Sequence, residues 1–484
     1  MSERNEATQV AVIGAGPGGY AAAFAAADQG LRVTLIDEDA RLGGVCLQRG
    51  CIPSKALLHA AQVLREARRA AGFGIEFGPP KIDLGKLRAW KNRVIEKLTG
   101  GLGQLARDRR ITYLQGRASF ESGTSLFVAL AGGGRLRLEF EHAILATGSR
   151  PVKLPIAPDS PRVMDSTRAL ELEEIPETLL VVGGGYIGLE LATVYAALGS
   201  KVSLVEMTDG LLPGADRDLV RPLAARMKSE LHQLMLNTRV AEMHDTGEKV
   251  RVRFEAAGAS AGAGGAGGGA GTSGEQEYDR VLIAVGRRPN TEGLGLENTR
   301  VEVDERGFVK VDAQRRTAEP TIFAIGDVAG EPMLAHKASH EGKVAAEAIA
   351  GRRVAFEPRA IPAVVYTDPE IAWCGLTESQ AKAEGRAVKV VRFPWGASGR
   401  AATLDRADGV TKLIVDPETE HVLGVGISGP GAGELIAEGV LAVEMAAVAA
   451  DVMLTIHPHP TLSETVMEAA ELIYGQSTHF YRKG

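Results

Sequence analysis

The sequence contains few cysteines, little net charge and no long run of apolar residues. Three cysteines in 484 residues exclude a small secreted fold held together by disulfides. The formal net charge of -6 leaves no broad basic surface, so we expect no nucleic-acid partner. The apolar segments are short and broken by glycine, well below the length of a bilayer span, so we expect no membrane span either.

The amino-terminal residues, MSERNEATQVAVIGAG, lead almost directly into a first strand. They contain neither an apolar signal core nor the Arg- and Ser-rich pattern of a transit peptide. We therefore expect a cytoplasmic protein in a reducing compartment. In such a compartment, a close pair of cysteines is more typical of redox chemistry or metal binding than of a structural disulfide. The length of the chain indicates roughly two to four domains.

One pattern occurs twice in the chain: an apolar strand, a G-x-G-x-x-G turn, a helix, and a second strand that ends in an acid. The first copy contains Gly14, Gly16, Gly19 and Asp37, and the second contains Gly183, Gly185, Gly188 and Glu206. The first glycine and the acid are 23 residues apart in both copies. Two ordinary strand–helix turns could also need glycine for close packing, but matched spacing in both copies favours two dinucleotide sites in an α/β fold.

The physical reason for the glycines is the same in each copy. The first makes a tight turn, the second lets the backbone approach a pyrophosphate, and the third lets the helix pack against its strand. A carboxylate at the end of the second strand accepts hydrogen bonds from ribose hydroxyls and repels a 2′-phosphate, so Glu206 favours NAD over NADP. Lys201 precedes that strand and does not change this preference. Two such sites predict a flavoprotein that works with a nicotinamide.

Residues 256–274 are almost entirely glycine and alanine. Such a composition buries too little apolar surface to offset the entropy lost on ordering. The flanking segments are both strand-like, so we predict a disordered extension of a β-hairpin and assign it no function.

Two of the three cysteines lie close together in GGVCLQRGCIPSKALL. Pro53 belongs in the first turn of a helix, which places Cys51 at or just before the helix N-terminus, where a thiolate is favoured. A disulfide requires Cα atoms within about 7 Å, so the segment Cys46–Cys51 must break from a regular helix, and Gly50 could relieve that turn. We favour a redox pair over zinc, because no second pair or clustered histidine accompanies it, and zinc over coincidence. The third cysteine, Cys374, is expected to be a buried small apolar residue.

Taken with GGVCLQRGCIPSK and the two glycine patterns, the motifs AVGRRPN, TIFAIGDV, PMLAHKASHEG and HPHPTLSE resemble the flavoprotein disulfide reductase family almost from end to end. The resemblance is strongest to members that oxidise protein-bound dihydrolipoamide with NAD. It implies an α/β fold with two Rossmann-like domains, a central domain and a C-terminal α+β domain. The implied boundaries are 1–150 for FAD, 151–284 for NAD, 285–352 for the central domain that completes the FAD site, and 353–484 for dimerisation.

The resemblance also implies the residues that bind FAD and NAD, with no metal. Those expected around FAD are Gly14, Gly16, Gly19, Asp37, Lys55, Gly148, Asp327 and Ala335. Those expected around NAD are Gly183, Gly185, Gly188, Glu206, Val240 and Gly286. From pattern alone, Asp327 would be a turn or helix-cap residue.

The catalytic roles likewise come from the resemblance. Cys46 is expected to exchange with the substrate thiols, and Cys51 to face the flavin as a thiolate. Lys55 and Glu190 would pair near the flavin, although each alone reads as a charged helix residue.

In the motif HPHPTLSE, the resemblance makes His459 the catalytic base and Glu464 the carboxylate that orients it. Histidine suits this role because its ordinary pKa of about 6.5 lets it exchange protons near neutral pH. Glu464 also completes a capping-box pattern with Thr461, and both roles can coexist on one carboxylate. His457 is expected to be structural. Because the base comes so late in the chain, the resemblance implies that it serves the partner subunit of a homodimer.

The expected partners are lipoyl domains and the acyltransferase core of 2-oxo acid dehydrogenase complexes. A glycine-cleavage complex is the alternative setting.

Glutathione and trypanothione reductases, which use NADP, usually carry lysine in place of Ser54, and mercuric reductase carries a C-terminal cysteine pair that this chain lacks. Tyr186 departs from the aliphatic residue common in dihydrolipoamide-oxidising members. This departure leaves a second alternative open, in which the chain is a related flavoprotein that acts on another disulfide or on a metal ion. A non-catalytic scaffold is the third alternative, against which the intact cysteines and His459 argue.

Overall fold

The first sheet carries the first glycine turn. The computed structural model describes residues 4–257 and 271–481. The sheet has six strands, in the order β1–β2–β3–β4–β5–β16, and β1 also pairs with β5. The strands are β1 (Arg4–Ile13), β2 (Val33–Asp37), β3 (Thr112–Ser122), β4 (Ser125–Leu130), β5 (Arg135–Leu145) and β16 (Ile322–Ala324). The end of β1 is fully apolar and buried, as expected of a parallel strand covered on both faces.

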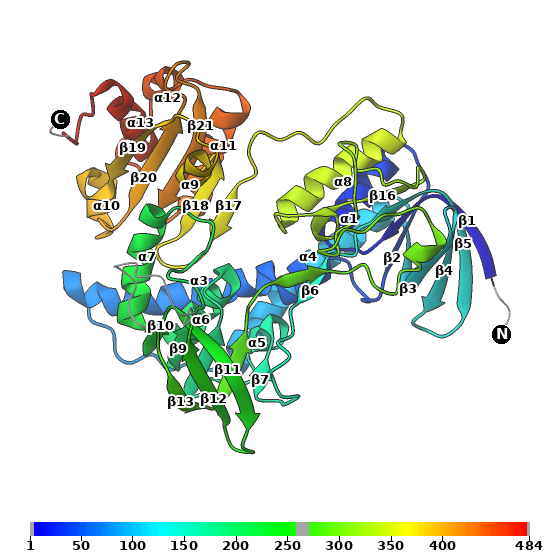
Figure 1. Ribbon diagram of the computed structural model, residues 1–484, viewed down its shortest axis with the longest axis horizontal. Coiled ribbons are helices and arrows are strands. Elements are labelled where there is room, and N and C mark those ends of the chain that lie inside the picture. The colour runs from blue at the N-terminus through cyan, green and yellow to red at the C-terminus, as the bar shows by residue number, and fades with distance from the viewer. Residues whose placement is uncertain (1–3, 258–270, 482–484) are drawn as a thin grey trace.

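Helices α1 (Pro17–Asp28) and α8 (Ala335–Ile349) pack together over this sheet (Figure 1). Their small residues allow a close approach: a Cβ on Gly342 would lie 2.7 Å from the carbonyl oxygen of Gly18. This packing brings a segment more than 300 residues downstream against the first glycine turn.

The second sheet carries the second glycine turn and is parallel throughout, in the order β10–β9–β8–β14–β7. Its strands are β7 (Val163–Met164), β8 (Thr178–Val182), β9 (Lys201–Val205), β10 (Gln233–Met235) and β14 (Arg280–Ile283). An antiparallel sheet of β11 (Thr238–Asp245), β12 (Val250–Ala256) and β13 (Gly274–Tyr278) shares a hydrophobic core with it.

The Gly/Ala segment joins two paired strands. Phe254 of β12 lies opposite Gly274 of β13, so the predicted hairpin is confirmed. The predicted disorder falls on residues 258–270, which lie outside the described residues.

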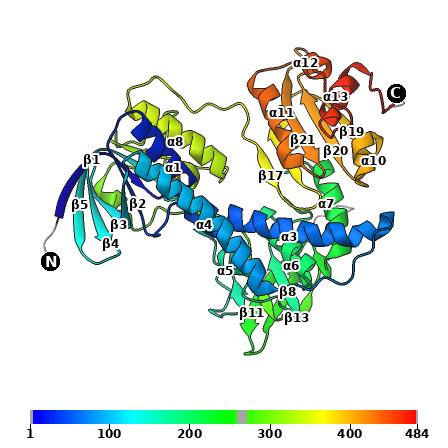
Figure 2. The same cartoon turned by 180° about the vertical axis from the view of Figure 1, so that it is seen from behind.

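The third unit is an antiparallel sheet in the order β17–β18–β21–β20–β19. Its strands are β17 (Ala363–Val365), β18 (Ile371–Gly375), β19 (Lys389–Pro394), β20 (Val410–Val415) and β21 (Val422–Ser428), and its main helices are α11 (Ala432–Glu444), α12 (Ala449–Leu454) and α13 (Glu464–Glu471). Seen from behind, the long helix α3 (Cys51–Arg69) runs between this unit and the second sheet (Figure 2).

The predicted fold class is confirmed: two Rossmann-like units and a C-terminal α+β unit. The domain boundaries stay a prediction, and β16 pairs with the first sheet although it lies in residues 285–352. Within the described part of the chain, every helix is too short or too polar to cross a bilayer.

Candidate active site

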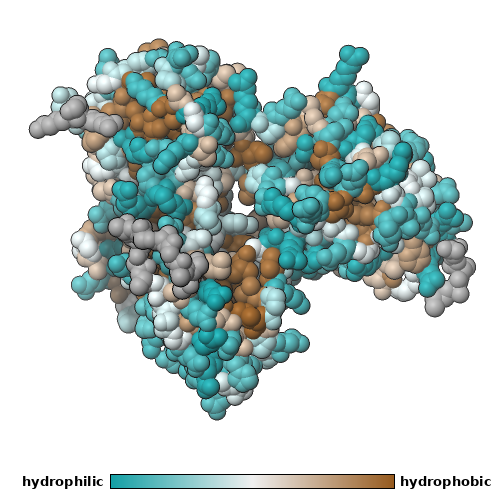
Figure 3. All heavy atoms as spheres, in the orientation of Figure 1, coloured by the Kyte–Doolittle hydropathy of each residue, from teal (hydrophilic) through white to brown (hydrophobic). Residues whose placement is uncertain are grey.

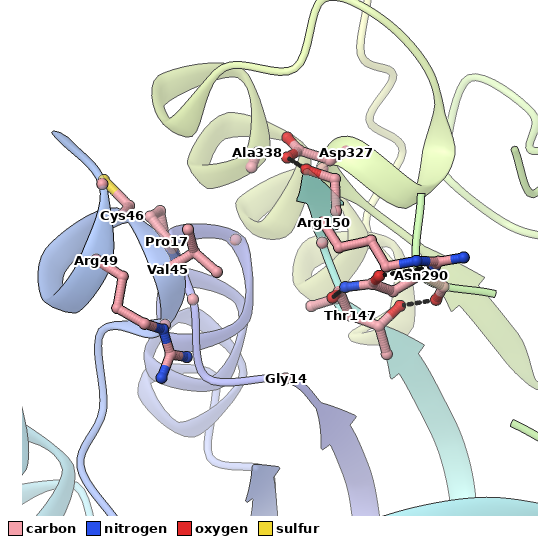
Figure 4. Close-up of a pocket in the computed structure, with 18 of the residues that line it drawn as sticks. Gly14, Pro17, Val45, Cys46, Arg49, Thr147, Arg150, Asn290, Asp327 and Ala338 are labelled. Carbon is pink, nitrogen blue, oxygen red and sulfur yellow. Dashed lines mark hydrogen bonds between the residues drawn. The ribbon is translucent and has the colours of Figure 1, made fainter. Parts of the chain in front are cut away.

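A cavity of about 900 Å³ opens between the first glycine turn, the cysteine segment, the start of α6 (Tyr186–Leu198) and the turn before α8. Figure 4 shows Cys46 and Arg49 on one side of it and Asp327, Arg150 and Asn290 on the other. The residues expected from the sequence that line it are Gly14, Gly16, Asp37, Cys46, Cys51, Lys55, Gly148, Glu190, Asp327 and Ala335. Ten site residues from distant parts of the chain therefore meet in one cavity.

The three glycines of the first turn have different roles. Gly14 has a φ of +104°, and a Cβ there would lie 2.2 Å from the carbonyl oxygen of Ala146. A Cβ on Gly19 would lie 1.7 Å from the carbonyl oxygen of Gly14. Gly16 lines the cavity, and a Cβ there would meet no protein atom within 4 Å. The fold therefore requires the first and third glycines, whereas the second leaves room for a ligand.

The acid of each copy holds its own glycine turn. Asp37 accepts hydrogen bonds from the backbone N–H groups of Ala15, at 2.5 Å, and Asp39, at 2.9 Å. Burial raises the pKa of Asp37, and these two bonds oppose the rise. Glu206 accepts from Gly184 N–H at 2.7 Å and Thr208 N–H at 2.9 Å.

The second glycine turn repeats the geometry of the first. Gly183 has a φ of +109°, and a Cβ on Gly188 would lie 2.1 Å from the carbonyl oxygen of Gly183. A Cβ on Gly185 would meet no protein atom within 4 Å. This turn therefore also has room for a pyrophosphate.

The other two residues expected at NAD lie on different elements. Val240 is half-buried in β11, and Gly286, with a φ of +125°, follows β14. None of the six residues expected at NAD lines the 900 Å³ cavity.

The cysteine segment breaks between two helices, as predicted. Helix α2 (Gly44–Arg49) ends before Gly50, and α3 begins at Cys51. Gly50 is not helical, and a Cβ on it would lie 2.9 Å from the carbonyl oxygen of Val45 and 3.3 Å from the Cα of Cys46. Pro53 lies in the first turn of α3. Glycine at position 50 thus allows the close approach of the two cysteines.

The two cysteines are thiols joined by a hydrogen bond. That bond is the largest cause of a raised pKa at Cys46, with burial next. The same bond lowers the pKa of Cys51 to about 7, against the effect of burial, and the charge of Lys55 lowers it further. Cys46 therefore keeps its proton while Cys51, which lines the cavity, becomes the thiolate. No histidine or carboxylate of the described residues completes a three-ligand metal site with this pair.

Lys55 and Glu190 form an ion pair, with the Nζ atom 3.0 Å and 2.8 Å from the two carboxylate oxygens. Only 4% of the Glu190 side chain is exposed. Tyr366 completes the arrangement: its backbone N–H donates to Glu190 at 3.1 Å, and its ring centroid lies 4.4 Å from the Lys55 Nζ. Nothing in the sequence pattern indicated Tyr366.

The sequence reasoning also missed the residues that hold Asp327. Ser149 donates a hydrogen bond to the Asp327 carboxylate at 2.5 Å, and Arg287 donates to the Ser149 hydroxyl at 2.7 Å. On the other side, the fully buried Glu341 accepts from the N–H of Gly326 at 2.6 Å and pairs with Lys337. Lys337 and Glu341 are charged residues four apart in PMLAHKASHEG, and this spacing was the one available signal.

Tyr186 is the first residue of α6 and lines the cavity. Burial raises its pKa to about 12, so its hydroxyl stays protonated at neutral pH. Cys374 is 1% exposed, as predicted, and burial raises its pKa to about 12.

His459 and Glu464 are paired but lie outside the cavity. The His459 Nδ1 is 2.8 Å from one oxygen of Glu464, and the other oxygen accepts from the N–H of Thr461 at 2.7 Å. Burial disfavours the Glu464 charge, but these hydrogen bonds outweigh it and lower the pKa. The His459 side chain is 69% exposed.

The capping-box prediction is only half right. The Glu464 carboxylate does reach back to Thr461, but the Thr461 hydroxyl donates to the carbonyl of Pro458, and α13 begins only at Glu464. His457 is buried between the Thr455 carbonyl and Glu438, at 2.7 Å from each, which agrees with a structural role.

Comparisons with known proteins match both parts of the chain. The family model described as pyridine nucleotide-disulphide oxidoreductase matches residues 8–342, and its dimerisation domain matches residues 361–470. A dihydrolipoyl dehydrogenase of Vibrio parahaemolyticus is 49% identical over 476 residues, which cover 98% of this chain and 97% of that protein. One from Thermus scotoductus is 46% identical, covering 98% of each chain.

Solved structures agree. LpdA from Mycobacterium tuberculosis superposes with a TM-score of 0.87 at 28% identity, covering 96% of this chain and 99% of that one. The HOCl-induced flavoprotein disulfide reductase RclA from Escherichia coli gives a TM-score of 0.82 at 29% identity, covering 96% and 100%.

Proposed function

Since the chain belongs to the pyridine nucleotide-disulphide oxidoreductase family, we propose that it is an NAD-dependent dihydrolipoyl dehydrogenase. It oxidises protein-bound dihydrolipoamide to lipoamide and reduces NAD⁺ to NADH. One observation carries the proposal: a thiol pair with a single stabilised thiolate opens into a large cavity beside the first glycine turn.

FAD fits this cavity, and NAD fits the second glycine turn. Gly16 leaves space for a pyrophosphate at the N-terminus of α1, and Asp37 lies at the end of β2 for the ribose. Gly185 and Glu206 repeat this arrangement at α6. When bound in the cavity, FAD supplies the two-electron link between the thiols and NAD⁺.

The thiol pKa values support one order of exchange. A substrate thiolate attacks Cys46 of the Cys46–Cys51 disulfide, forming a mixed disulfide and releasing Cys51 as a thiolate. Since a thiol of lower pKa leaves faster, the charge of Lys55, which lowers the pKa of Cys51, favours attack at Cys46. The second substrate thiol, after losing its proton, displaces Cys46, which yields the cyclic disulfide of lipoamide and leaves both cysteines reduced.

The proton acceptor is His459, oriented by Glu464. The described residues supply no partner to the Nε2 of His459, whose side chain is exposed and outside the cavity of its own chain. We therefore assign it to the cysteine pair of a second copy in a homodimer, in keeping with the dimerisation domain at 361–470.

An apolar surface on the C-terminal unit supports this dimer (Figure 3). Four large apolar side chains of this unit, Leu441, Met445, Leu454 and Ile456, are 62–94% exposed in the single chain. A patch of this kind marks a protein interface.

The proposed setting is the cytoplasm, with lipoyl domains of 2-oxo acid dehydrogenase or glycine-cleavage complexes as partners. The test is NADH formation at 340 nm from dihydrolipoamide and NAD⁺ by the purified yellow protein. Rapid turnover that is lost in Cys46→Ser is expected. Negligible activity with dihydrolipoamide but turnover with glutathione disulfide or Hg(II) would assign the protein to another branch, and a colourless, inactive chain would favour a scaffold.

A further inference from the structure

A second cavity, of about 300 Å³, lies where the ends of three helices meet: α3, α6 and α7 (Arg217–Glu230). We call it the arginine pocket. Its lining residues are Arg65, Arg68, Arg69, Ala196, Ala197, Arg226 and Glu230. Four arginines and one glutamate thus line this small space.

Two of these arginines keep unused donors. The Arg65 side chain is only 9% exposed, and its Nη2 donates to Glu230 at 2.7 Å. Arg68 donates from Nη2 to the carbonyl of Ala197 at 3.0 Å. Within the described residues, the remaining N–H groups of both guanidiniums have no hydrogen-bond acceptor. Each arginine carries five such donors, so most are available to a ligand.

The carboxylates behind the pocket are already shared. Arg226 pairs with Asp368 and Asp408, each at 3.0 Å. Arg406 pairs with the same two carboxylates, at 2.6 Å and 3.1 Å. Asp368 also lies 4.0 Å from Arg69, so this one carboxylate is shared among three arginines.

Positive charge is therefore in excess at this site. The nearest carboxylate to Arg69 is Asp368, at 4.0 Å, and Glu230 is the one acid in the lining. Burial lowers the pKa of Arg65, and the neighbouring charges of Arg226 and Arg68 add to the effect, whereas Glu230 and Asp368 oppose it. Four arginines and one glutamate line the pocket, so an anion would offset the excess of positive charge.

We propose that the arginine pocket binds a small phosphate-bearing anion, either orthophosphate or the phosphate of a mononucleotide. The planar guanidinium fork matches phosphate oxygens, which it can bind with two parallel hydrogen bonds. The pocket has a third of the volume of the active-site cavity, so it is not a third dinucleotide site.

The site is separate from the active site but shares two helices with it. Helix α3 begins at Cys51 and α6 begins at Tyr186, and both residues line the active-site cavity. The arginine pocket lies at the opposite ends of these helices. A bound anion would tie α3 to α7 and raise the melting temperature, since it binds only the folded protein.

The test is calorimetric titration of the FAD-loaded protein with sodium phosphate at constant ionic strength, with NAD⁺ in excess to occupy the second glycine turn. We expect saturable binding that Arg68→Ala/Arg69→Ala weakens roughly tenfold or more, because charge-assisted hydrogen bonds are lost. The matched control, Arg239→Ala/Arg251→Ala, removes two exposed arginines from the antiparallel sheet and should leave the affinity unchanged.

Glu230→Gln supplies a test in the opposite direction. Removing the one carboxylate of the lining should strengthen phosphate binding by roughly threefold or more. If Arg68→Ala/Arg69→Ala does not fold, this variant and Arg68→Lys/Arg69→Lys, which keeps charge but not the fork, still decide the question. Tighter binding of 5′-AMP than of phosphate would identify a mononucleotide ligand, and the reverse would identify free phosphate. No saturable binding, or binding unaffected by these variants, would overturn the proposal and leave the arginines as an interdomain clamp.

Discussion

Lys55 and Glu190 are 135 positions apart in the chain, yet the Lys55 Nζ lies within 3.0 Å of both carboxylate oxygens of Glu190. Both charges act on Cys51, in opposite directions: the lysine lowers its pKa and the glutamate raises it. The pair therefore partly cancels, and the hydrogen bond from Cys46 remains the main cause of the lowered pKa.

Replacing one member of the Lys55–Glu190 pair at a time should shift the Cys51 pKa in opposite directions. Lys55→Met should raise it, because a nearby cation that favours the thiolate is lost, and Glu190→Gln should lower it. The measurement is the pH dependence of iodoacetamide alkylation in the reduced protein, with Lys201→Met, a surface lysine paired with Glu177, as the control. Shifts of the same sign in both variants would contradict the assignment.

The thiol hydrogen bond predicts which cysteine reacts first. With a pKa of about 7, Cys51 is mainly thiolate above pH 7 and mainly thiol below it, so its alkylation rate should be half-maximal near pH 7. Peptide mapping should find the label on Cys51 before Cys46. In Cys46→Ala the midpoint should move to higher pH, since the hydrogen bond to the thiolate is gone. Preferential labelling of Cys46 would contradict the assignment of the thiolate to Cys51.

The second glycine of each turn should separate the two nucleotide sites. The Cβ added in Gly16→Ala or in Gly185→Ala would meet no protein atom within 4 Å, so both variants should fold. Gly16→Ala should lose FAD on purification, whereas Gly185→Ala should stay yellow and show a KM for NAD⁺ raised roughly tenfold or more. Gly72→Ala, which also meets nothing within 4 Å, is the control. Normal FAD retention by Gly16→Ala would place the pyrophosphate elsewhere.

Glu464→Gln should impair the base without unfolding the protein. The amide has one acceptor oxygen and cannot serve both Thr461 N–H and the His459 ring. We expect kcat to fall roughly 10- to 100-fold with dihydrolipoamide. Glu468 lies on the same helix and pairs with His479, so Glu468→Gln breaks a second histidine–glutamate pair. This control should lower kcat much less. Equal losses in both variants would indicate a general effect on α13.

Asp216 should stabilise the contact between α7 and the C-terminal unit. It accepts hydrogen bonds from Ser379 and from Lys412, whose side chain is 1% exposed. Lys412 also pairs with Asp218 and Glu378, so it is not left without a partner in Asp216→Asn. The substitution should therefore cost about 1.5–3 kcal/mol at neutral pH, seen as a lower melting temperature.

The Asp216–Lys412 pair also predicts how the melting temperatures of Asp216→Asn and the unchanged protein differ with pH. Burial disfavours the Asp216 charge, but Lys412 and Ser379 outweigh it and lower the pKa from 3.8 to about 2. A lowered pKa means that the stabilisation is complete above pH 3.8 and is lost as the pH falls through 2. The melting-temperature difference between the two proteins should therefore shrink as the pH falls from 5 toward 2. A constant difference would exclude the carboxylate as its cause.

Much of this protein could be predicted from short segments of the sequence. Gly14 and Asp37 are 23 residues apart within one strand–helix–strand unit, so local backbone sterics and burial periodicity determine their arrangement. The same holds for the turn at Gly50, where a few ångströms of backbone separation allow only glycine.

Only the tertiary structure decided which distant side chains meet. Tyr366 beside Lys55, Arg287 against Ser149, and the arginine pocket carry no local signal, because each depends on how separate helices and sheets pack. The family resemblance supplied the pairing of Lys55 with Glu190, which periodicity could not. Local sterics act over a few residues, whereas contacts between distant segments are set by the packing of whole units, so a motif can be recognised in the sequence but the surroundings of its side chains cannot.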